Sequence, residues 1–437
     1  ACIESRGSLG GTCLNVGCIP SKSLLNLSEN FHKAKKDFNQ QGIEIDGIKL
    51  NIEKMMSNKN KSIQVLTKGV EFLFKKNKVT YIKGKGVLFS KNDINVYDNN
   101  KKTNYRAKNI VIATGSEVAS LPGIDIDEKN IISSTGALSL NKVPKKLAII
   151  GGGYIGLEMG SVWSRLGSEV TVIEYLDYIT PGMDREISNE FKKILIKQGM
   201  KFQMNSKVNS VDKTSMGVSI NYTDIKSSKE ETLKFDKVLI SVGRKPYTEG
   251  LNLAKIGVKK DNKGRIEVNE KLQTTIKNIY AIGDVIKGPM LAHKAEEEGI
   301  AAAEIIAGQA GHVNYDVIPG VIYTSPEVAT VGKTEEKLKE EKKSYKVGKF
   351  PFLANSRAKV NNVTEGFVKI LADSKTDKVL GVHIIGPHCG DMIAEMALAM
   401  EFGASAEDIA RTCHAHPTHT EAIKEAALAV DKRPIHF

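Results

Sequence analysis

Two cysteines lie five positions apart in the glycine-rich segment 10–22, which reads GGTCLNVGCIPSK. In a regular helix, residues five apart rise about 7.5 Å and point away from one another, so Cys13 and Cys18 can meet only where the chain bends. The glycines of the segment permit that bend. A structural disulfide would close only a four-residue loop, and a zinc site would need a second pair of ligands. The spacing therefore favours a redox-active pair over a structural disulfide or a metal half-site.

The residues that follow the pair indicate how one thiol is activated. Pro20 suits the first turn of a helix, and a helical pattern follows over residues 21–34. Cys18 then lies near the N-terminus of that helix, where the helix dipole favours a thiolate. Lys22 stands one turn behind it, within the same helix.

A dithiol pair needs a base that takes and returns protons, and the segment 414–421 (HAHPTHTE) offers one. Histidine titrates near neutrality, and a carboxylate partner can fix its tautomer and raise its basicity. Three histidines at this spacing also suit a metal ion, but no other ligand cluster is visible and Pro417 interrupts the geometry. A packed, non-catalytic histidine cluster is the other alternative.

A complete nucleotide-binding βαβ pattern occupies residues 145–177. An apolar run over 147–150 meets Gly151-x-Gly153-x-x-Gly156, a helical pattern covers 154–166, and a second apolar run over 170–173 ends at Glu174. The three glycines allow a tight turn, a close approach of a pyrophosphate and close packing of helix on strand. Glu174 is placed for a ribose hydroxyl pair, and with no arginine close behind it the pattern favours NAD over NADP.

Other segments predict a second nucleotide-binding unit. Residues 1–4 (ACIE) resemble the end of such a second strand, so the matching first strand, glycine loop and helix would be absent from this chain. Residues 109–116 and 275–284 read as buried strands that end in glycine turns. Asp284 would then face the ligand crevice and could accept a bond from a ribityl hydroxyl. A frayed tail and a plain turn aspartate are the simpler alternatives.

The last 120 residues have a different pattern. Short β-like runs cover 320–331, 348–352, 366–371 and 379–385, and helical stretches cover 390–402, 406–413 and 420–430. Strands followed by helices predict a separate α+β domain. The stretch 392–400 (MIAEMALAM) is apolar on most sides, which suits a buried helix or a subunit interface.

The composition excludes several classes of protein. The formal net charge is +12, but the 63 basic residues include only nine arginines and the lysines are scattered, so we expect no nucleic-acid partner. No apolar run is long enough to cross a membrane, and we expect no membrane partner. Five cysteines in 437 residues indicate a reducing compartment. The first residues show neither a signal-peptide core nor a transit pattern.

Taken in order, the motifs resemble those of the flavin-dependent pyridine-nucleotide disulfide oxidoreductases along essentially the whole chain. They are GGTCLNVGCIPSK, GGGYIGLE, SVGRKP, YAIGDV, FPFLANSRAK and CHAHPT. Within that family, CIPSK with LANSRAK and HAHPT is similar to the dihydrolipoamide dehydrogenases, whereas glutathione reductases typically read CVPKK. Three features depart from the family pattern: the first GxGxxG is missing, Ser325 replaces a common histidine, and His419-Thr420 replace an apolar residue and serine.

The resemblance implies a role for each motif residue. Cys18 would be the thiol beside the flavin, and Cys13 would exchange disulfides with lipoamide. His416 would be the acid and base, oriented by Glu421, and both would come from the opposite subunit of a homodimer. No metal site is implied. The expected FAD contacts are Glu4, Gly11, Thr12, Lys22, Thr114, Gly115, Asp284, Leu291, Ala292 and His293. The expected contacts with NAD or the flavin edge are Gly151, Gly153, Gly156, Glu158, Glu174, Gly243 and Arg244. Lys22 and Glu158 would pair close to the flavin edge.

The implied fold is α/β, with two Rossmann-like dinucleotide-binding domains for FAD and NAD and a C-terminal α+β dimerisation domain. We expect an N-terminally incomplete FAD domain at 1–116, an NAD domain at 117–246, a central part at 247–314 that completes the FAD domain, and an interface domain at 315–437.

The implied activity oxidises protein-bound dihydrolipoamide to lipoamide and reduces NAD⁺. The alternatives are a glutathione reductase-like enzyme and a flavin-free, non-catalytic subunit. Expected partners are lipoyl domains and the acyltransferase core of 2-oxo acid dehydrogenase complexes, or the lipoyl protein of glycine cleavage. The expected location is a bacterial cytoplasm, with the mitochondrial matrix as the alternative.

Overall fold

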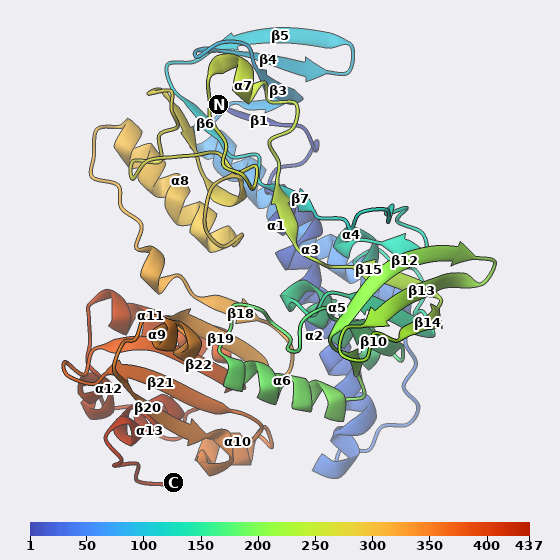
Figure 1. The fold of residues 1–437 in the computed structure, drawn as a ribbon, viewed down its shortest axis with the longest axis vertical. Coiled ribbons are helices and arrows are strands. Elements are labelled where there is room, and N and C mark those ends of the chain that lie inside the picture. The colour runs from blue at the N-terminus through green and yellow to red at the C-terminus, as the bar shows by residue number, and fades with distance from the viewer.

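The computed structural model describes residues 1–437, and its chain forms three lobes (Figure 1). One lobe holds the N-terminus with segments from the middle of the chain, the second holds most of residues 120–245, and the third holds the C-terminal 120 residues. Two long helices, α2 (Cys18–Lys36) and α3 (Ile52–Lys76), pack against each other. The helix predicted over 21–34 is therefore present, and it begins at Cys18.

The second lobe is built on a parallel sheet whose strand order is β11-β10-β9-β15-β8. The predicted βαβ unit is present, because β9 and β10 pair in parallel and α5 lies between them in sequence. Its apolar strands are buried on both faces, as a sheet covered by helices requires. An antiparallel meander lies beside the sheet. The elements are β7 (Ser116–Val118), β8 (Ile131–Ile132), α4 (Ser134–Ala137), β9 (Lys146–Ile150), α5 (Tyr154–Arg165), β10 (Glu169–Ile173), α6 (Arg185–Lys197), β11 (Lys201–Gln203), β12 (Ser206–Thr214), β13 (Gly217–Asp224), β14 (Glu230–Phe235), β15 (Lys237–Ile240) and β16 (Arg244–Pro246).

In the first lobe, strands far apart in sequence pair in parallel. β6 (Ile110–Ile112) pairs with β17 (Ile279–Ala281), and β1 (Cys2–Glu4) pairs with β2 (Tyr81–Lys83). Parallel pairing brings the carboxyl ends of β6 and β17 together. Both strands are shorter than the apolar runs of the sequence. The remaining elements are α1 (Gly11–Val16), η1 (Phe38–Gln41), β3 (Lys85–Leu88), β4 (Asp93–Asp98), β5 (Lys101–Arg106), α7 (Leu253–Ile256), η2 (Gly283–Val285) and α8 (Ala292–Ile306).

The third lobe is an antiparallel sheet with helices on it, in the strand order β18-β19-β22-β21-β20. The run expected over 320–331 is a hairpin, because a turn with a cis Ser325–Pro326 peptide divides it. Only one face of α11 is buried: Met392 and Met396 are in the core, whereas Leu398 is 61% exposed. The elements are η3 (Tyr315–Val317), β18 (Gly320–Ile322), β19 (Glu327–Gly332), α9 (Glu335–Glu340), β20 (Tyr345–Pro351), η4 (Phe352–Ala354), α10 (Ser356–Val360), β21 (Phe367–Asp373), β22 (Val379–Gly386), α11 (Cys389–Glu401), α12 (Ala406–Arg411) and α13 (Glu421–Val430).

A buried ionic cluster joins the second and third lobes. Lys369 of β21 is 1% exposed, and its ammonium lies 3.0 Å from both carboxylate oxygens of Asp184 and 2.6 Å from Glu335. Asp184 is also the N-cap of α6, and it accepts bonds from the backbone N–H groups of Glu186 and Glu335. One carboxylate therefore caps a helix of one lobe and neutralises a lysine of the other.

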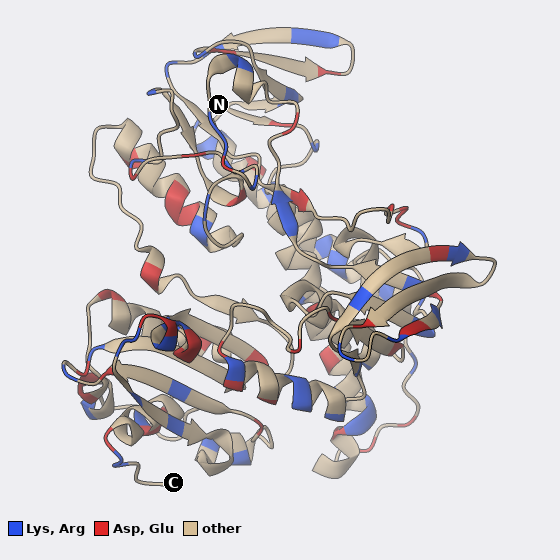
Figure 2. Cartoon of the chain, in the orientation of Figure 1, with Lys and Arg blue, Asp and Glu red and all other residues tan.

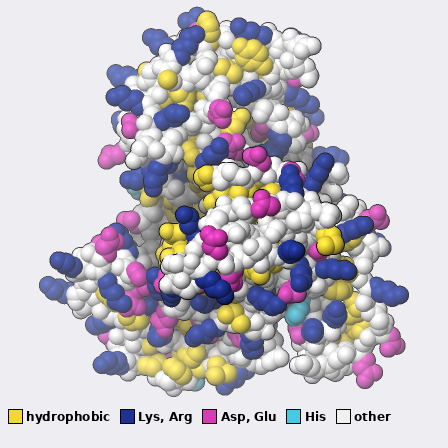
Figure 3. Space-filling model, turned by 45° about the vertical axis from the view of Figure 1, so that its right-hand side comes forward, with side chains coloured by type: hydrophobic (Ala, Val, Ile, Leu, Met, Phe, Trp, Pro, Cys, Tyr) yellow, Lys and Arg dark blue, Asp and Glu magenta, His cyan; other side chains and the backbone are white.

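Charged side chains are spread over all three lobes (Figure 2). On the face drawn in Figure 3, lysine and arginine side chains are scattered among polar and apolar ones and form no continuous stripe. None of the helices is both long enough and apolar enough to cross a membrane.

The strand pair β7–β16 lies at the residues where the sequence places two domain limits, 116 and 246. Those limits remain predictions.

Candidate active site

The two cysteines lie on either side of the expected bend. Cys13 is in α1 and Cys18 is the first residue of α2, with Gly17 between the helices. A Cβ atom on residue 17 would lie 2.9 Å from the Thr12 carbonyl oxygen and 3.3 Å from the Cys13 Cα. The close approach of the two helical turns therefore leaves no space for a side chain at residue 17.

The structure holds both cysteines as half-buried thiols whose acidities differ strongly. Hydrogen bonding with the Cys13 thiol and the nearby Lys22 ammonium together outweigh the opposing effect of burial and lower the pKa of Cys18 to about 7. The same contact and burial raise the pKa of Cys13 well above its ordinary value. Cys18 is thus the thiol that holds a negative charge near neutral pH, as its place at the start of α2 predicts.

Lys22 and Glu158 meet beside Cys18, although they are 136 positions apart in sequence. The Lys22 ammonium lies 3.0 and 2.9 Å from the two Glu158 carboxylate oxygens. Glu158 is buried on α5 and also accepts a bond of 3.0 Å from the Tyr323 backbone N–H. Lys22 lies 4.5 Å from the centre of the Tyr323 ring. The pair expected at the flavin edge is therefore formed by the packing of α2 on α5, and a segment of the third lobe covers it.

The glycine loop after β9 has the geometry that the sequence predicts for each glycine. Gly151 has φ +106°, and a Cβ there would lie 2.5 Å from the Ser241 carbonyl oxygen. A Cβ at Gly156 would lie 2.5 Å from the Gly151 carbonyl oxygen, so helix and strand pack too closely for any side chain. A Cβ at Gly153 would meet nothing within 4 Å. This open side at the start of α5 leaves room for a pyrophosphate.

Glu174 is buried at the carboxyl end of β10 and is already bonded to the loop. Its carboxylate accepts bonds from the backbone N–H groups of Gly152, at 2.5 Å, and Leu176, at 2.8 Å. A carboxylate has about four lone-pair positions, so each oxygen can still accept a ribose hydroxyl. Gly243, with φ +120° and open space where a Cβ would be, immediately precedes β16.

The residues expected to line FAD gather at the joined ends of β6 and β17. Asp284 accepts a hydrogen bond from the Ser116 hydroxyl, which itself accepts one of 2.6 Å from the Arg244 Nε–H. The Thr114 hydroxyl donates to the Tyr247 carbonyl oxygen at 2.6 Å. Gly115 has φ +72° and no neighbour where a Cβ would be. An acceptor beside an open glycine turn fits a ribityl chain, and the Lys22–Glu158 pair fits the polar edge of a flavin.

The remaining residues expected at FAD lie at three helix or strand ends. Glu4 ends β1, and its carboxylate accepts a bond of 2.7 Å from the Arg6 backbone N–H. Gly11 and Thr12 begin α1. Leu291 precedes α8, whose first residues are Ala292 and His293. His293 Nε2 lies 2.7 Å from the Pro319 carbonyl oxygen. These contacts position the residues, and their part in binding FAD remains a prediction.

The expected base is at the far end of the chain. His416 Nδ1 lies 2.9 Å from a Glu421 carboxylate oxygen, and the Thr418 backbone N–H donates to the other oxygen at 2.8 Å. Burial opposes ionisation of Glu421, but the Thr418 N–H and the His416 ring outweigh it and lower the pKa of Glu421. The His416 side chain is 70% exposed. Glu421 thus fixes the ring while Nε2 is free to face a reactant.

The other two histidines of the segment are engaged elsewhere. His414 is buried and its Nε2 lies 2.9 Å from Glu395, whose hydrogen bond raises the pKa of His414. His419 stacks on His388 with ring centres 5.3 Å apart. The three rings therefore have three different sets of neighbours, and the structure groups no three His, Cys, Asp or Glu side chains in a metal-ligand arrangement.

Within one chain the base does not reach the thiols. No hydrogen bond or ion pair joins His416 or Glu421 to Cys13 or Cys18. α13, which begins at Glu421, lies at the bottom of Figure 1, whereas α1 lies near the centre of the molecule. The expectation that the base is supplied by a second chain agrees with this separation.

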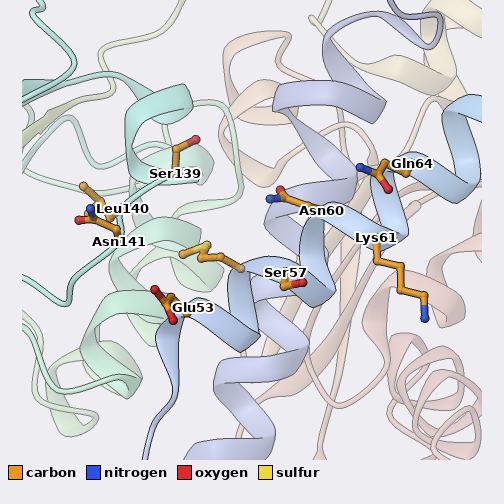
Figure 4. A pocket seen from close by; sticks show the side chains of 9 residues that line it. Glu53, Ser57, Asn60, Lys61, Gln64, Ser139, Leu140 and Asn141 are labelled. Carbon is orange, nitrogen blue, oxygen red and sulfur yellow. The ribbon is translucent and has the colours of Figure 1, made fainter.

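A surface pocket of about 700 Å³ lies away from these residues. Figure 4 shows that one long helix, α3, supplies one wall and the segment after α4 supplies the other. Only two of its nine lining residues are apolar, and none is a residue that the sequence singled out. The lining residues are Glu53, Met56, Ser57, Asn60, Lys61, Gln64, Ser139, Leu140 and Asn141.

Sequence reasoning missed one buried pair close to this site. Lys294 and Glu298 of α8 are 1% and 0% exposed, and they lie 2.8 Å apart. They belong to the run KAEEEG, which reads as a solvated helix face. Only the burial of Glu298 among exposed acidic neighbours sets it apart, and the sequence gives no signal of that.

Two family models match the chain. One, described as pyridine nucleotide-disulphide oxidoreductase, matches residues 1–299, and the other, described as the dimerisation domain of the same group, matches residues 318–427. Curated proteins match along the full chain. It is 57% identical over 437 residues to dihydrolipoyl dehydrogenase 1, mitochondrial, of Arabidopsis thaliana, which covers 100% of this chain and 86% of that protein. It is 58% identical over 438 residues to the dihydrolipoamide dehydrogenase of Chaetomium thermophilum, with 100% and 87% covered.

Solved structures share the whole architecture. The structure of LpdA from Mycobacterium tuberculosis superposes with a TM-score of 0.90 at 23% identity and covers 97% of this chain and 92% of that one, which shows the fold alone. The HOCl-induced flavoprotein disulfide reductase RclA from Escherichia coli superposes with a TM-score of 0.84 at 26% identity, with 98% and 93% covered. The expected α/β fold, with nucleotide-binding domains and a dimerisation domain, is confirmed.

Proposed function

This chain belongs to the pyridine nucleotide-disulphide oxidoreductase family, and from that premise we propose that it is a dihydrolipoyl dehydrogenase. The reaction oxidises dihydrolipoamide to lipoamide and reduces NAD⁺, with FAD and NAD as cofactors. The observation that carries the proposal is the pair Cys13 and Cys18 across the Gly17 bend, with the acidic thiol beside the Lys22–Glu158 pair. Full-length relatives of this name support it at 55–58% identity.

We assign the first half of the reaction to the two cysteines in their disulfide form. A thiolate of dihydrolipoamide attacks the Cys13 sulfur, a mixed disulfide forms, and Cys18 leaves as a thiolate. The second lipoyl thiol then displaces Cys13 and closes the lipoamide disulfide. Cys18 is suited to leave first because its pKa of about 7 makes it the better leaving group at neutral pH. FAD, which the residues at the ends of β6 and β17 would hold, would supply the two-electron chemistry that links the dithiol to NAD⁺.

The thiol–disulfide exchange needs a group that accepts and returns protons, because the pKa of Cys13 is raised. We assign that role to His416 of the partner subunit, held by the Glu421 carboxylate at 2.9 Å. The base takes the proton from the attacking lipoyl thiol and returns it to Cys13 when that thiol leaves. The dimerisation domain supports a homodimer, in which each site would combine the cysteines of one chain with the histidine of the other.

We propose that the partners of this chain are the lipoyl domains and the acyltransferase core of 2-oxo acid dehydrogenase complexes, or the lipoyl protein of glycine cleavage. For the location we propose the mitochondrial matrix, because relatives from Arabidopsis thaliana, Pisum sativum and Caenorhabditis elegans are named mitochondrial. The bacterial cytoplasm expected from the sequence has no support among these relatives.

The test is turnover of the purified protein. We expect reduction of NAD⁺ by dihydrolipoamide, yellow colour from bound flavin, and loss of turnover in Cys18→Ser. Faster turnover of glutathione disulfide with NADPH would instead assign the chain to the glutathione reductase-like alternative. A colourless protein without activity would favour the flavin-free subunit.

A further inference from the structure

The turn that carries Asp284 is held from behind by a buried ion pair. Both backbone groups of Gly283 are engaged: its N–H donates to Glu298 at 2.6 Å, and its carbonyl oxygen accepts from the Lys294 ammonium at 3.2 Å. Lys294 and Glu298 also bond to each other at 2.8 Å. The glycine is therefore clamped between the two ends of one ion pair, directly before the residue expected to meet the flavin.

The pair is poorly suited to stabilising its own helix. Lys294 is the third residue of α8, where the helix dipole disfavours a cation, and lysine four positions before glutamate is the weaker orientation of an i,i+4 pair. Removing two charges from water carries a large desolvation cost for each ion, so a buried pair is weak evidence for a stabilising role. Its burial at 1% and 0% exposure needs another reason.

The turn at Gly283 has a backbone conformation that residues other than glycine rarely adopt. Gly283 has φ +75°, and a Cβ there would lie 3.1 Å from the Ala295 Cβ of the same helix. On the other side, the Asp284 carboxylate accepts the Ser116 hydroxyl, which Arg244 in turn holds. Asp284 is thus fixed from two directions, by α8 through the backbone of its neighbour and by β7 through its side chain.

A third contact ties the clamp to the segment that enters the third lobe. The Tyr315 hydroxyl donates to Glu298 at 2.9 Å, so the Glu298 carboxylate has three donors. Burial and the Glu298 carboxylate raise the pKa of Tyr315, which keeps its hydroxyl a donor. Every polar atom of the cluster is satisfied, as a buried polar network requires.

We propose that Lys294 and Glu298 are positioning residues for FAD, which set the Gly283–Asp284 turn so that the carboxylate meets the ribityl chain. The proposal rests on the proposed function, since it assumes that Asp284 faces FAD. The pair would act through the backbone of Gly283 and touch no reactant. The same helix begins with Ala292 and His293, so one element would set the two protein surfaces expected around the flavin.

The test compares two buried ion pairs of the same protein. In Lys294→Met/Glu298→Gln the charges are removed together, which avoids leaving one ion unpaired. The matched control is Lys369→Met/Asp184→Asn, which removes the equally buried pair between the second and third lobes. For each holoenzyme, release of FAD after dilution is followed by flavin fluorescence at a temperature where circular dichroism shows the chain folded. The visible circular dichroism of the bound flavin reports its geometry.

We expect release of FAD to be about tenfold faster in Lys294→Met/Glu298→Gln, as the loss of one bond to a charged group predicts. The flavin dichroism should change in the same variant. The control should stay within about twofold of wild type in both measurements. Equal release rates in wild type and the Lys294–Glu298 variant, or an equal increase in the control, would overturn the proposal and assign the pair a structural role only.

A milder variant covers the case in which the double change does not fold. Tyr315→Phe removes one donor from Glu298 and leaves the ion pair intact, and we expect release of FAD about two- to fivefold faster. An unchanged rate and an unchanged flavin spectrum there would also contradict the proposal. Wild-type turnover of dihydrolipoamide, measured in parallel, separates this question from the proposed function, since it can succeed while the clamp is refuted.

Discussion

The two halves of the redox site are built in opposite ways. The thiols lie half-buried at the junction of α1 and α2, with a buried glutamate, a lysine and a backbone N–H from the third lobe around them. The base, His416, is 70% exposed and has one side-chain partner. Under the proposed function, the path of electrons would be organised within one chain, whereas the path of protons would be completed between chains.

Removing the thiol half of the redox site should have the largest effect. Cys18→Ser should reduce turnover of dihydrolipoamide with NAD⁺ to below about a thousandth of wild type, because no disulfide can form. Steady-state absorbance of NADH measures it, and FAD content checks that the flavin remains bound. Near-normal turnover would refute the assignment of Cys18.

Removing the exposed half should cost somewhat less. His416→Gln should lower the rate by about 10²- to 10⁴-fold, the range for a lost acid–base group, because thiol exchange still proceeds slowly through water. Rapid-mixing measurement of disulfide reduction by dihydrolipoamide isolates this step. The reoxidation of the dithiol by NAD⁺ should change far less.

Mixing the two variants sharpens the comparison. In a heterodimer of Cys18→Ser with His416→Gln, one site holds both substitutions and the other holds neither. Re-formed mixed dimers should therefore regain about half of the wild-type rate per dimer, although each parent retains about a hundredth of that rate or less. If both groups came from the same chain, mixing would restore nothing.

Orientation of the base should matter less than the base itself. Glu421→Gln keeps the contact but loses a charge-assisted bond, so we expect a rate about ten- to a hundredfold lower. The matched control is Glu395→Gln, which removes the carboxylate that holds His414 instead, and it should stay within about twofold. Equal losses in both variants would show a general effect on the histidine segment.

Removing a positive charge beside Cys18 should have the smallest effect. Its folded pKa of about 7 is below the ordinary value of 9.0, so the thiolate is present above pH 7 and is lost as the pH falls through 7. Lys22→Met removes a neighbouring cation and should move this titration upward by on the order of one unit, which lowers the thiolate fraction, and with it the reactivity, about fivefold at pH 7.

Alkylation of the reduced protein as a function of pH, with Cys18 followed by mass spectrometry, measures the shift. Lys33→Met, further along α2 and paired with Glu29 at its surface, is the control and should leave the titration unchanged. An unshifted titration in Lys22→Met would show that the Cys13 contact alone sets the acidity of Cys18.

The local features of the site could be predicted because local physics determines them. The bend at Gly17, the roles of Gly151 and Gly156, and the strand ends at Asp284 and Glu174 each follow from a spacing of residue types. The fold class followed for the same reason, since the apolar runs, glycine loops and helical patterns agree with one another along the chain.

Long-range features could not be predicted in this way. Glu298 stands in an exposed acidic run and Lys369 in an apolar strand, and neither sequence context shows a partner. The meanders β3–β5 and β12–β14 and the long helix α3 contain none of the glycine loops or reactive residues of the motifs, so no motif indicated them. Pairs such as Lys22 with Glu158 were expected only because the family resemblance implied them.

The shared carboxylate of Asp184 has a consequence for how the molecule melts. It caps α6 in the second lobe and neutralises Lys369 in the third, and both residues are almost fully buried. Unfolding of the third lobe would leave the buried Asp184 carboxylate without its lysine, and unfolding of the second would leave Lys369 with Glu335 as its remaining carboxylate partner. The two lobes should lose their structure in one calorimetric transition, and replacing Lys369 and Asp184 together by Met and Asn should divide that transition into two.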